Sequence, residues 1–244
     1  MEVINFNANS LAFAVFLGLA PVVFWLGFWL REDSEHPEPK GVLFLTFLFG
    51  MGAVLVALPL EYGVLYIGKK IGIDGTFYGM MAVVFFWALI EEILKFIAAK
   101  KAAMKKSSFD EPIDALIYLI TASLGFAALE NIFFLLRVIG ADGMVSGFIT
   151  GNLRFVGATL LHTATSAIVG SSIAFSFYPP RKRLPNIIGS LGLATVLHFI
   201  FNYFIIKGGG TGFLKIFVPL WILIIIIIFT FEKVKKIKKQ PYVQ

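Results

Sequence analysis

The sequence predicts an all-α membrane protein, a bundle of about seven transmembrane helices. Its 244 residues are 58% hydrophobic with a mean hydropathy of +0.86, whereas an ordinary soluble domain is about half apolar. Apolar runs recur along the chain, and each is close to or above the ~20 residues that a helix needs to cross a ~30 Å hydrocarbon core. The seven runs are Leu11–Leu30, Gly41–Ile67, Thr76–Ala99, Ile113–Leu136, Gly147–Phe177, Ile187–Ile206 and Phe213–Phe231.

Only short polar segments connect these runs, so residues 1–244 are interpreted as a single transmembrane domain. The first run is interpreted as a retained span rather than a secretory signal, because no basic residue precedes it and its apolar stretch is long. The fifth run is long enough to require tilt or an end outside the bilayer. The absence of cysteine excludes disulfides and thiolate metal sites.

The basic residues predict the orientation of the bundle. With the N-terminus outside, fourteen lysines and arginines fall in inner segments and six in outer ones, in agreement with the positive-inside rule. Segment 232–244 is then a basic cytoplasmic tail of a multi-pass protein in the cytoplasmic membrane. The net charge of +6 is thus explained by topology and not by nucleic-acid binding. The six outer residues are Lys69, Lys70, Arg137, Arg154, Lys207 and Lys215.

The third run carries charged residues where a membrane helix normally has none. In "FWALIEEILKF", Glu91 lies about 22 Å from a helix start near Thr76, a depth inside the bilayer. Lys95 follows Glu91 by four residues and Glu92 by three, so it can pair with either carboxylate. Because adjacent helical residues point about 100° apart, pairing with one acid leaves the other free. Intramembrane ionisable groups usually mark function, although a snorkelling ion-paired cluster is the alternative.

Three further runs each contribute a deep polar side chain. Glu130 lies in the fourth run, His162 in the fifth, and His198 in the sixth. Asn202 follows His198 by four residues and projects from the same helix face. A lone histidine or asparagine in a membrane helix is often only an interhelical hydrogen-bonding residue. Because four separate runs each carry a carboxylate or a histidine, we interpret them as one polar site inside the bundle.

Such a set of carboxylates and histidines can activate water in two ways. Glu91 can act as general base with help from Glu92 or a histidine, while His198 and Asn202 stabilise a tetrahedral oxyanion. The alternative is a zinc site, and the two possibilities stay open. The zinc ligands would come from Glu91, Glu130, His162 and His198.

Four motifs can be recognised along the chain: "EEILKF" at 91–96, "FDEPIDALIY" leading into "GFAALEN" at 109–131, "HTATSAIVG" at 162–170 and "HFIFN" at 198–202. Together they resemble the ordered signature of the PrsW-type intramembrane proteases. The resemblance covers residues 76–203 and is fairly specific, because the motifs occur in the right order on four successive runs. It also implies kinship with the type II CAAX prenyl endopeptidases and bacteriocin-processing (CPBP) membrane proteases.

The resemblance implies an intramembrane endopeptidase that cleaves single-span or membrane-anchored proteins within the lipid bilayer, as in the site-1 cleavage of anti-sigma factors. It leaves the cofactor open, since the wider group has been described both as zinc-type metalloproteases and as metal-free glutamate proteases. The site residues that it implies are Glu91 and Glu92 as the catalytic pair, Lys95 as their basic partner, His162, His198 and Asn202 as further catalytic residues, and Glu130 and Asn131 in support.

Two differences from the family pattern concern the substrate. The prenyl endopeptidases have a histidine where this chain has Glu130, which disfavours CAAX-type processing. Many PrsW-like sequences have glycine where this chain has Phe199 and an acid where it has Asn202. Two other functions stay open as alternatives: a non-proteolytic binding or immunity-type protein of the same fold, and an ion- or proton-coupled transporter. The sequence shows no inverted repeat that would favour the transporter.

Overall fold

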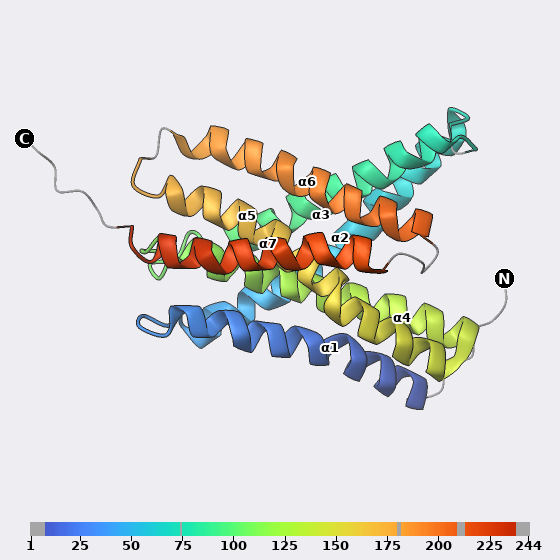
Figure 1. Ribbon diagram of the computed structural model, residues 1–244, viewed down its shortest axis with the longest axis horizontal. Coiled ribbons are helices and arrows are strands. Elements are labelled where there is room, and N and C mark those ends of the chain that lie inside the picture. The colour runs from blue at the N-terminus through green and yellow to red at the C-terminus, as the bar shows by residue number, and fades with distance from the viewer. Residues whose placement is uncertain (1–7, 74, 180–181, 209–212, 238–244) are drawn as a thin grey trace, which may run out of the picture.

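The computed structural model describes residues 8–73, 75–179, 182–208 and 213–237, which form α-helices joined by short connections (Figure 1). The all-α prediction is confirmed, as expected for apolar segments that must satisfy their backbone hydrogen bonds internally. Residues 238–244 of the predicted basic tail 232–244 lie outside the described residues. The elements are α1 (Ala8–Leu30), a 3-10 turn η1 (Arg31–Asp33), α2 (Lys40–Lys70), α3 (Phe77–Ala102), α4 (Asp114–Val156), α5 (Ala158–Phe175), α6 (Arg183–Gly208) and α7 (Phe213–Val234).

Within the described residues, five segments are long and apolar enough to cross a membrane. The third predicted run forms α3, which is not one of the five. The fourth and fifth runs are joined in one segment of 62 residues, which as a straight helix would be about 93 Å long, far more than one ~30 Å crossing requires. The five segments are Ala8–Asp33, Lys40–Lys70, Asp114–Phe175, Arg183–Lys207 and Phe217–Val234.

The long segment is a helical hairpin that reverses at Gly143. This residue has φ 82° and ψ 176°, a positive φ that glycine adopts readily. Beyond it the chain returns beside the part of α4 that directly precedes Gly143 (Figure 1). Gly147 faces Ile139 so closely that a Cβ at Gly147 would lie 2.4 Å from Ile139 Cγ1. The turn therefore separates the fourth and fifth predicted runs into two antiparallel legs.

The returning leg is broken once more, at Gly157, where the sequence suggested a single long run. Its φ of −121° and ψ of −82° end α4 and precede α5. A Cβ at Gly157 would lie 2.4 Å from Cε1 of Phe217 in α7. The missing side chain thus lets the aromatic ring pack against the break.

The first half of α4 is the centre of the bundle. Every residue from Asp114 to Ala128 is buried. Gly50 of α2 lies against α4 so closely that an added Cβ would be 2.0 Å from the carbonyl oxygen of Ala122. Likewise, a Cβ added at Gly125 would lie 2.1 Å from the carbonyl oxygen of Phe47. Small residues at both positions let the two backbones meet, which fixes α4 against α2.

Candidate active site

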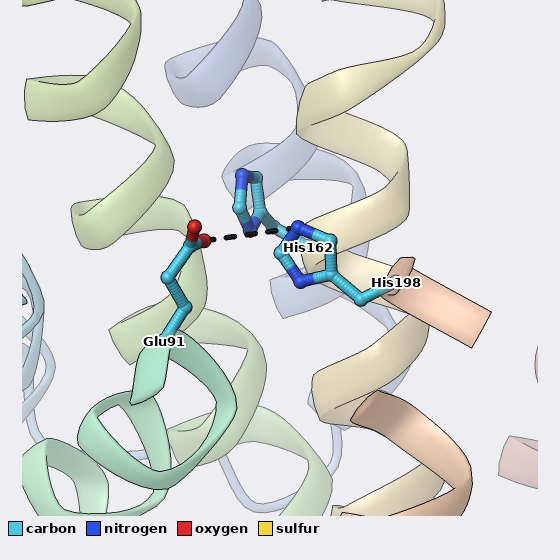
Figure 2. A group of neighbouring side chains, drawn as sticks. All are labelled: Glu91, His162 and His198. Carbon is cyan, nitrogen blue, oxygen red and sulfur yellow. Dashed lines mark ion pairs between the residues drawn. The ribbon is translucent and has the colours of Figure 1, made fainter. Parts of the chain in front are cut away.

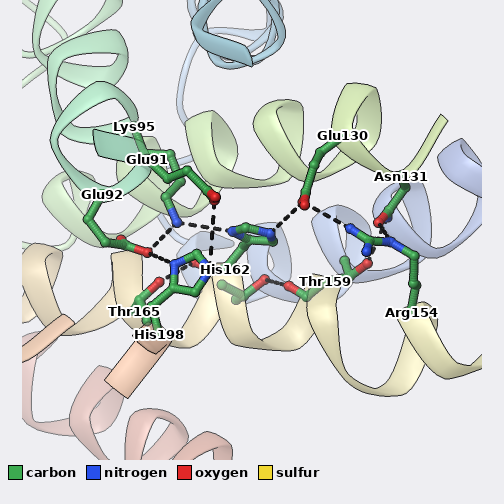
Figure 3. A network of polar contacts seen from close by, with 11 residues as sticks. Glu91, Glu92, Lys95, Glu130, Asn131, Arg154, Thr159, His162, Thr165 and His198 are labelled. Carbon is green, nitrogen blue, oxygen red and sulfur yellow. Dashed lines mark hydrogen bonds and ion pairs between the residues drawn. The ribbon is translucent and has the colours of Figure 1, made fainter. Parts of the chain in front are cut away.

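Polar side chains from four helices form one connected network inside the bundle (Figure 3). The helices bring together residues that are far apart in the sequence, and five of these residues are at most 8% exposed. The start of α3 is fixed by Thr76, whose hydroxyl accepts a 3.0 Å hydrogen bond from the backbone N–H of Gly79. The network contains Glu91, Glu92 and Lys95 of α3, Glu130 of α4, His162 of α5 and His198 of α6.

Of the two adjacent glutamates, Glu92 is the one that pairs with Lys95. Lys95 Nζ lies 2.5 Å from Glu92 Oε1, and the two side chains are only 0% and 1% exposed. His198 Nδ1 lies 2.7 Å from the same carboxylate oxygen. Buried charges persist only when they are paired and hydrogen-bonded. Glu92 and Lys95 therefore form a buried ion pair, and both histidines of the network contact it.

Glu91 is the carboxylate left without a close partner. Its Oε2 atom is buried and makes no hydrogen bond to any residue that the structure describes. His198 Nε2 lies 3.7 Å from this oxygen (Figure 2), too far for a direct hydrogen bond. A buried polar atom normally has a partner, so this oxygen indicates a place for a water molecule or a metal ion.

The orientation of His198 is set by Glu92. A carboxylate can only accept a hydrogen bond, so His198 Nδ1 carries the proton in that contact. In the neutral ring Nε2 is then an acceptor, and it faces Glu91. The contact with Glu92 thus directs Nε2 of His198 towards the free carboxylate.

His162 is oriented in the same way by Glu130. Its Nε2 lies 2.8 Å from Glu130 Oε2, so Nε2 carries the proton. Its Nδ1 accepts a hydrogen bond from Lys95 Nζ at 3.0 Å. The rings of His162 and His198 are nearly perpendicular, with centres 5.2 Å apart. Each histidine therefore has one nitrogen bonded to a carboxylate and the other directed into the network.

Arg154 extends the network beyond Glu130. The sequence predicts it only as an outer basic residue, and in the structure its Nη2 atom lies 2.9 Å from Glu130 Oε2. Its Nε also donates to Asn131 Oδ1, and Asn131 Nδ2 donates to Thr159 Oγ1 at 3.1 Å. Arg154 therefore belongs to the network, a role that the sequence did not predict. A signal was present, since Arg154 is the one formally charged residue in the run 147–177.

Asn202 lies apart from the other predicted site residues. It follows His198 by one helical turn in α6, is partly exposed, and makes no hydrogen bond to the described part of the chain. Asn202 is therefore close to His198 in the sequence, but it is not part of the hydrogen-bonded network.

The centre of the network has a donor set that fits a metal ion. Glu91, His162 and His198 each offer one ligand atom, and these atoms lie within 4.8 Å of one another. Both histidines are bonded on their other side to carboxylates, Glu92 and Glu130, as metal-binding histidines usually are. Two histidines and a glutamate form a known catalytic zinc set. Glu130 was also a predicted zinc ligand, but in the structure its carboxylate contacts Nε2 of His162.

Comparison with known proteins adds to this geometry. Residues 38–230 match the family described as PrsW family intramembrane metalloprotease. The chain is 28% identical to Protease PrsW of Geobacillus kaustophilus over 197 residues, covering 80% of this chain and 81% of the relative. It is 28% identical to Protease PrsW of Oceanobacillus iheyensis over 210 residues (86% and 90%) and 26% identical to that of Bacillus subtilis over 192 residues (76% and 79%). No solved structure matches the chain. With about four fifths of its length aligned to this family, the chain belongs to the PrsW intramembrane proteases.

Proposed function

We propose that this membrane protease cleaves membrane-anchored proteins with a water molecule activated at Glu91. Membership of the family supports proteolysis by a multi-pass membrane protein. The observation that carries the finer proposal is the buried Oε2 atom of Glu91, which has no hydrogen bond within the described residues. An acceptor nitrogen of His198 lies 3.7 Å away. A water molecule at this position would have two acceptors for its two protons.

In the proposed reaction, Glu91 takes a proton from this water as its oxygen bonds to the scissile carbonyl carbon. His198, held at Nδ1 by Glu92, would accept a hydrogen bond at Nε2 from the second proton of this water and so hold the water oxygen towards the carbonyl carbon. The carbon–nitrogen bond then breaks, and the proton held by Glu91 passes to the departing amine. Lys95 keeps Glu92 in place throughout, since its ammonium group lies 2.5 Å from that carboxylate.

A zinc-dependent version of the reaction uses the same residues. Glu91, His162 and His198 would hold the ion, and bound zinc supplies Lewis-acid activation of water. Lys95 would then have to leave His162 Nδ1, from which it is now 3.0 Å away. Zinc content and the activity of chelator-treated protein distinguish the two versions. Activity lost on chelation and restored by zinc supports the metal version, whereas full activity in metal-free protein supports the glutamate version.

We also propose the membrane arrangement and biological role. The protein would cross the cytoplasmic membrane about seven times, with its N-terminus outside and a basic tail inside. The distribution of lysine and arginine supports this orientation, and the hairpin at Gly143 supports two crossings within one helical segment. The substrate class would be single-span proteins of the anti-sigma-factor type. The motif resemblance also supports a distant relationship to the CPBP proteases.

The test compares the N-termini of membrane proteins in cells that produce wild-type protein or Glu91→Gln at equal levels. New termini in or beside a transmembrane segment should occur with wild type and be absent with Glu91→Gln. Glu232→Gln, which alters an exposed glutamate at the end of α7, should behave as wild type. Identical termini in all three strains would contradict the proposal and favour a binding protein of the same fold. Flux of ions or protons in liposomes would instead favour a transporter.

A further inference from the structure

A second group of buried carboxylates lies far from the candidate active site. Asp33 ends the turn after α1, Glu38 precedes α2, and Asp114 begins α4. Their exposed fractions are 5%, 8% and 2%. Asp114 and Glu130 are sixteen residues apart on one helix, which corresponds to about 24 Å. The group is therefore distinct from the network around Glu91.

The three carboxylates converge without enough donors to satisfy them. One oxygen of each lies within 4.8 Å of the others. The Tyr118 hydroxyl donates to Glu38 Oε2, and two backbone N–H groups of the preceding loop donate to Asp114 Oδ2 at 2.8 and 2.7 Å. Asp33 has no such donor: its Oδ2 atom is buried and makes no hydrogen bond in the described part of the molecule. A buried, unpartnered carboxylate aimed at two others indicates a missing positive group.

No basic side chain among the described residues forms an ion pair with these three carboxylates. Lys235 is bound to Glu32 at 2.7 Å, and His36 Nδ1 lies 3.9 Å from Glu111 Oε1. Burial raises the pKa of Glu38 above its ordinary value, as expected for a carboxyl group without a cation beside it. Within the described part of the chain, no basic side chain therefore pairs directly with the cluster.

We propose that Asp33, Glu38 and Asp114 form a binding site for a hard divalent cation, Ca²⁺ or Mg²⁺. Both ions prefer oxygen ligands and complete their coordination with water. A pocket of about 420 Å³, lined by Glu38, Ser108 and other residues of the two adjoining loops, is open to solvent and meets the cluster at Glu38. A bound cation joins the end of α1, the start of α2 and the start of α4. It thereby holds together the end of the bundle that we expect to face the cytoplasm.

Terbium luminescence provides a direct test, because Tb³⁺ occupies oxygen-rich Ca²⁺ sites and is excited by a nearby tyrosine. Tyr118 donates to Glu38, so its ring lies beside the proposed ion. The measurement uses the full chain in detergent with Glu91→Gln, which removes one ligand of the other candidate metal site. We expect saturable, tyrosine-sensitised emission that Ca²⁺ or Mg²⁺ displaces. Which ion displaces Tb³⁺ at the lower concentration identifies the preferred cation.

Two further substitutions in this background make the test specific. Asp33→Asn should weaken Tb³⁺ binding at least about tenfold, because it removes a charged ligand without changing the side-chain shape. Glu35→Gln removes the same charge from an exposed residue that lines the pocket, and should change the affinity less than about threefold. At one fixed concentration, added Ca²⁺ or Mg²⁺ should raise the melting temperature of the parent and of Glu35→Gln by similar amounts, and that of Asp33→Asn by less.

Equal Tb³⁺ affinity in the two variants would overturn the proposal. So would the absence of saturable emission from folded parent protein, which would mean that the carboxylates share protons instead of a cation. Circular dichroism in the presence of EDTA establishes that each variant is folded. If Asp33→Asn does not fold, Glu38→Gln takes its place in the same comparison.

Discussion

Replacing Lys95 with methionine should destabilise the protein by about 3 kcal/mol while leaving the packing around it nearly unchanged. Lys95 is fully buried, and its Nζ atom contacts Glu92 Oε1 at 2.5 Å and His162 Nδ1 at 3.0 Å. It also lies 5.6 Å from the ring centre of Phe126. Methionine has a similar length and contacts aromatic rings favourably. The substitution therefore removes the positive charge with little change in shape.

The magnitude follows from the charge that stays behind. Removing one partner of a buried ion pair costs about 3–5 kcal/mol, because the other charge is left uncompensated. Here His198 Nδ1 still lies 2.7 Å from the same oxygen of Glu92, so the lower end of this range is expected. A loss of about 3 kcal/mol is roughly a 150-fold change in the folding equilibrium. Combining Lys95→Met with Glu92→Gln should recover about 2 kcal/mol, since no unpaired charge then remains.

The assay is equilibrium unfolding in mixed micelles of dodecyl maltoside and SDS, followed by circular dichroism. Lys100→Met is the matched control, because Lys100 is an exposed lysine of the same helix that also lies over a phenylalanine, 5.7 Å from its ring centre. It should change the free energy of unfolding by less than about 0.5 kcal/mol. If Lys95→Met is within about 1 kcal/mol of wild type, the reasoning from the buried ion pair is refuted.

Three other predictions concern packing, the outer part of the network and topology. Gly50→Ala should lower the free energy of unfolding by about 1–3 kcal/mol, because its Cβ would lie 2.0 Å from a carbonyl oxygen of α4. Gly52→Ala, with nothing within 4 Å of its Cβ, should be neutral, and equal effects of the two would contradict the close approach. Arg154→Ala should reduce substrate cleavage about 10–100-fold, because it releases Glu130, the carboxylate that orients His162. Arg137 is exposed, and Arg137→Ala should leave cleavage unchanged. In this cysteine-free chain, Ser107→Cys should react with an impermeant maleimide only after cells are permeabilised, and labelling in intact cells would reverse the predicted orientation.

Much of the helical structure could be predicted because a membrane imposes strong local rules. Apolar runs near twenty residues long correspond to helices in the structure, and α3 begins directly after Thr76, where the third run was expected to start. The reversal at Gly143 falls between the fourth and fifth runs, in a short stretch that contains glycine and polar residues. The break at Gly157 was not predicted, because it depends on an aromatic ring from α7 that packs against it.

The candidate site was only partly visible in the sequence. Helical spacing showed that Lys95 can reach either Glu91 or Glu92, and the sequence left that choice open. The structure pairs it with Glu92, because His198 and His162 converge on that side of the lysine. The same spacing could not exclude Asn202 from the network, since a shared helix face does not fix the distance to other helices.

By itself, the sequence determined the all-helical class, the polar residues on four separate runs and the family resemblance. The tertiary structure decided which carboxylate is left without a partner and that Arg154 contacts Glu130. It also decided that carboxylates at the ends of α1, α2 and α4 meet. The physical reason is that periodicity and hydropathy act along one chain segment, whereas the partner of a buried charge is set by what the neighbouring helices present to it.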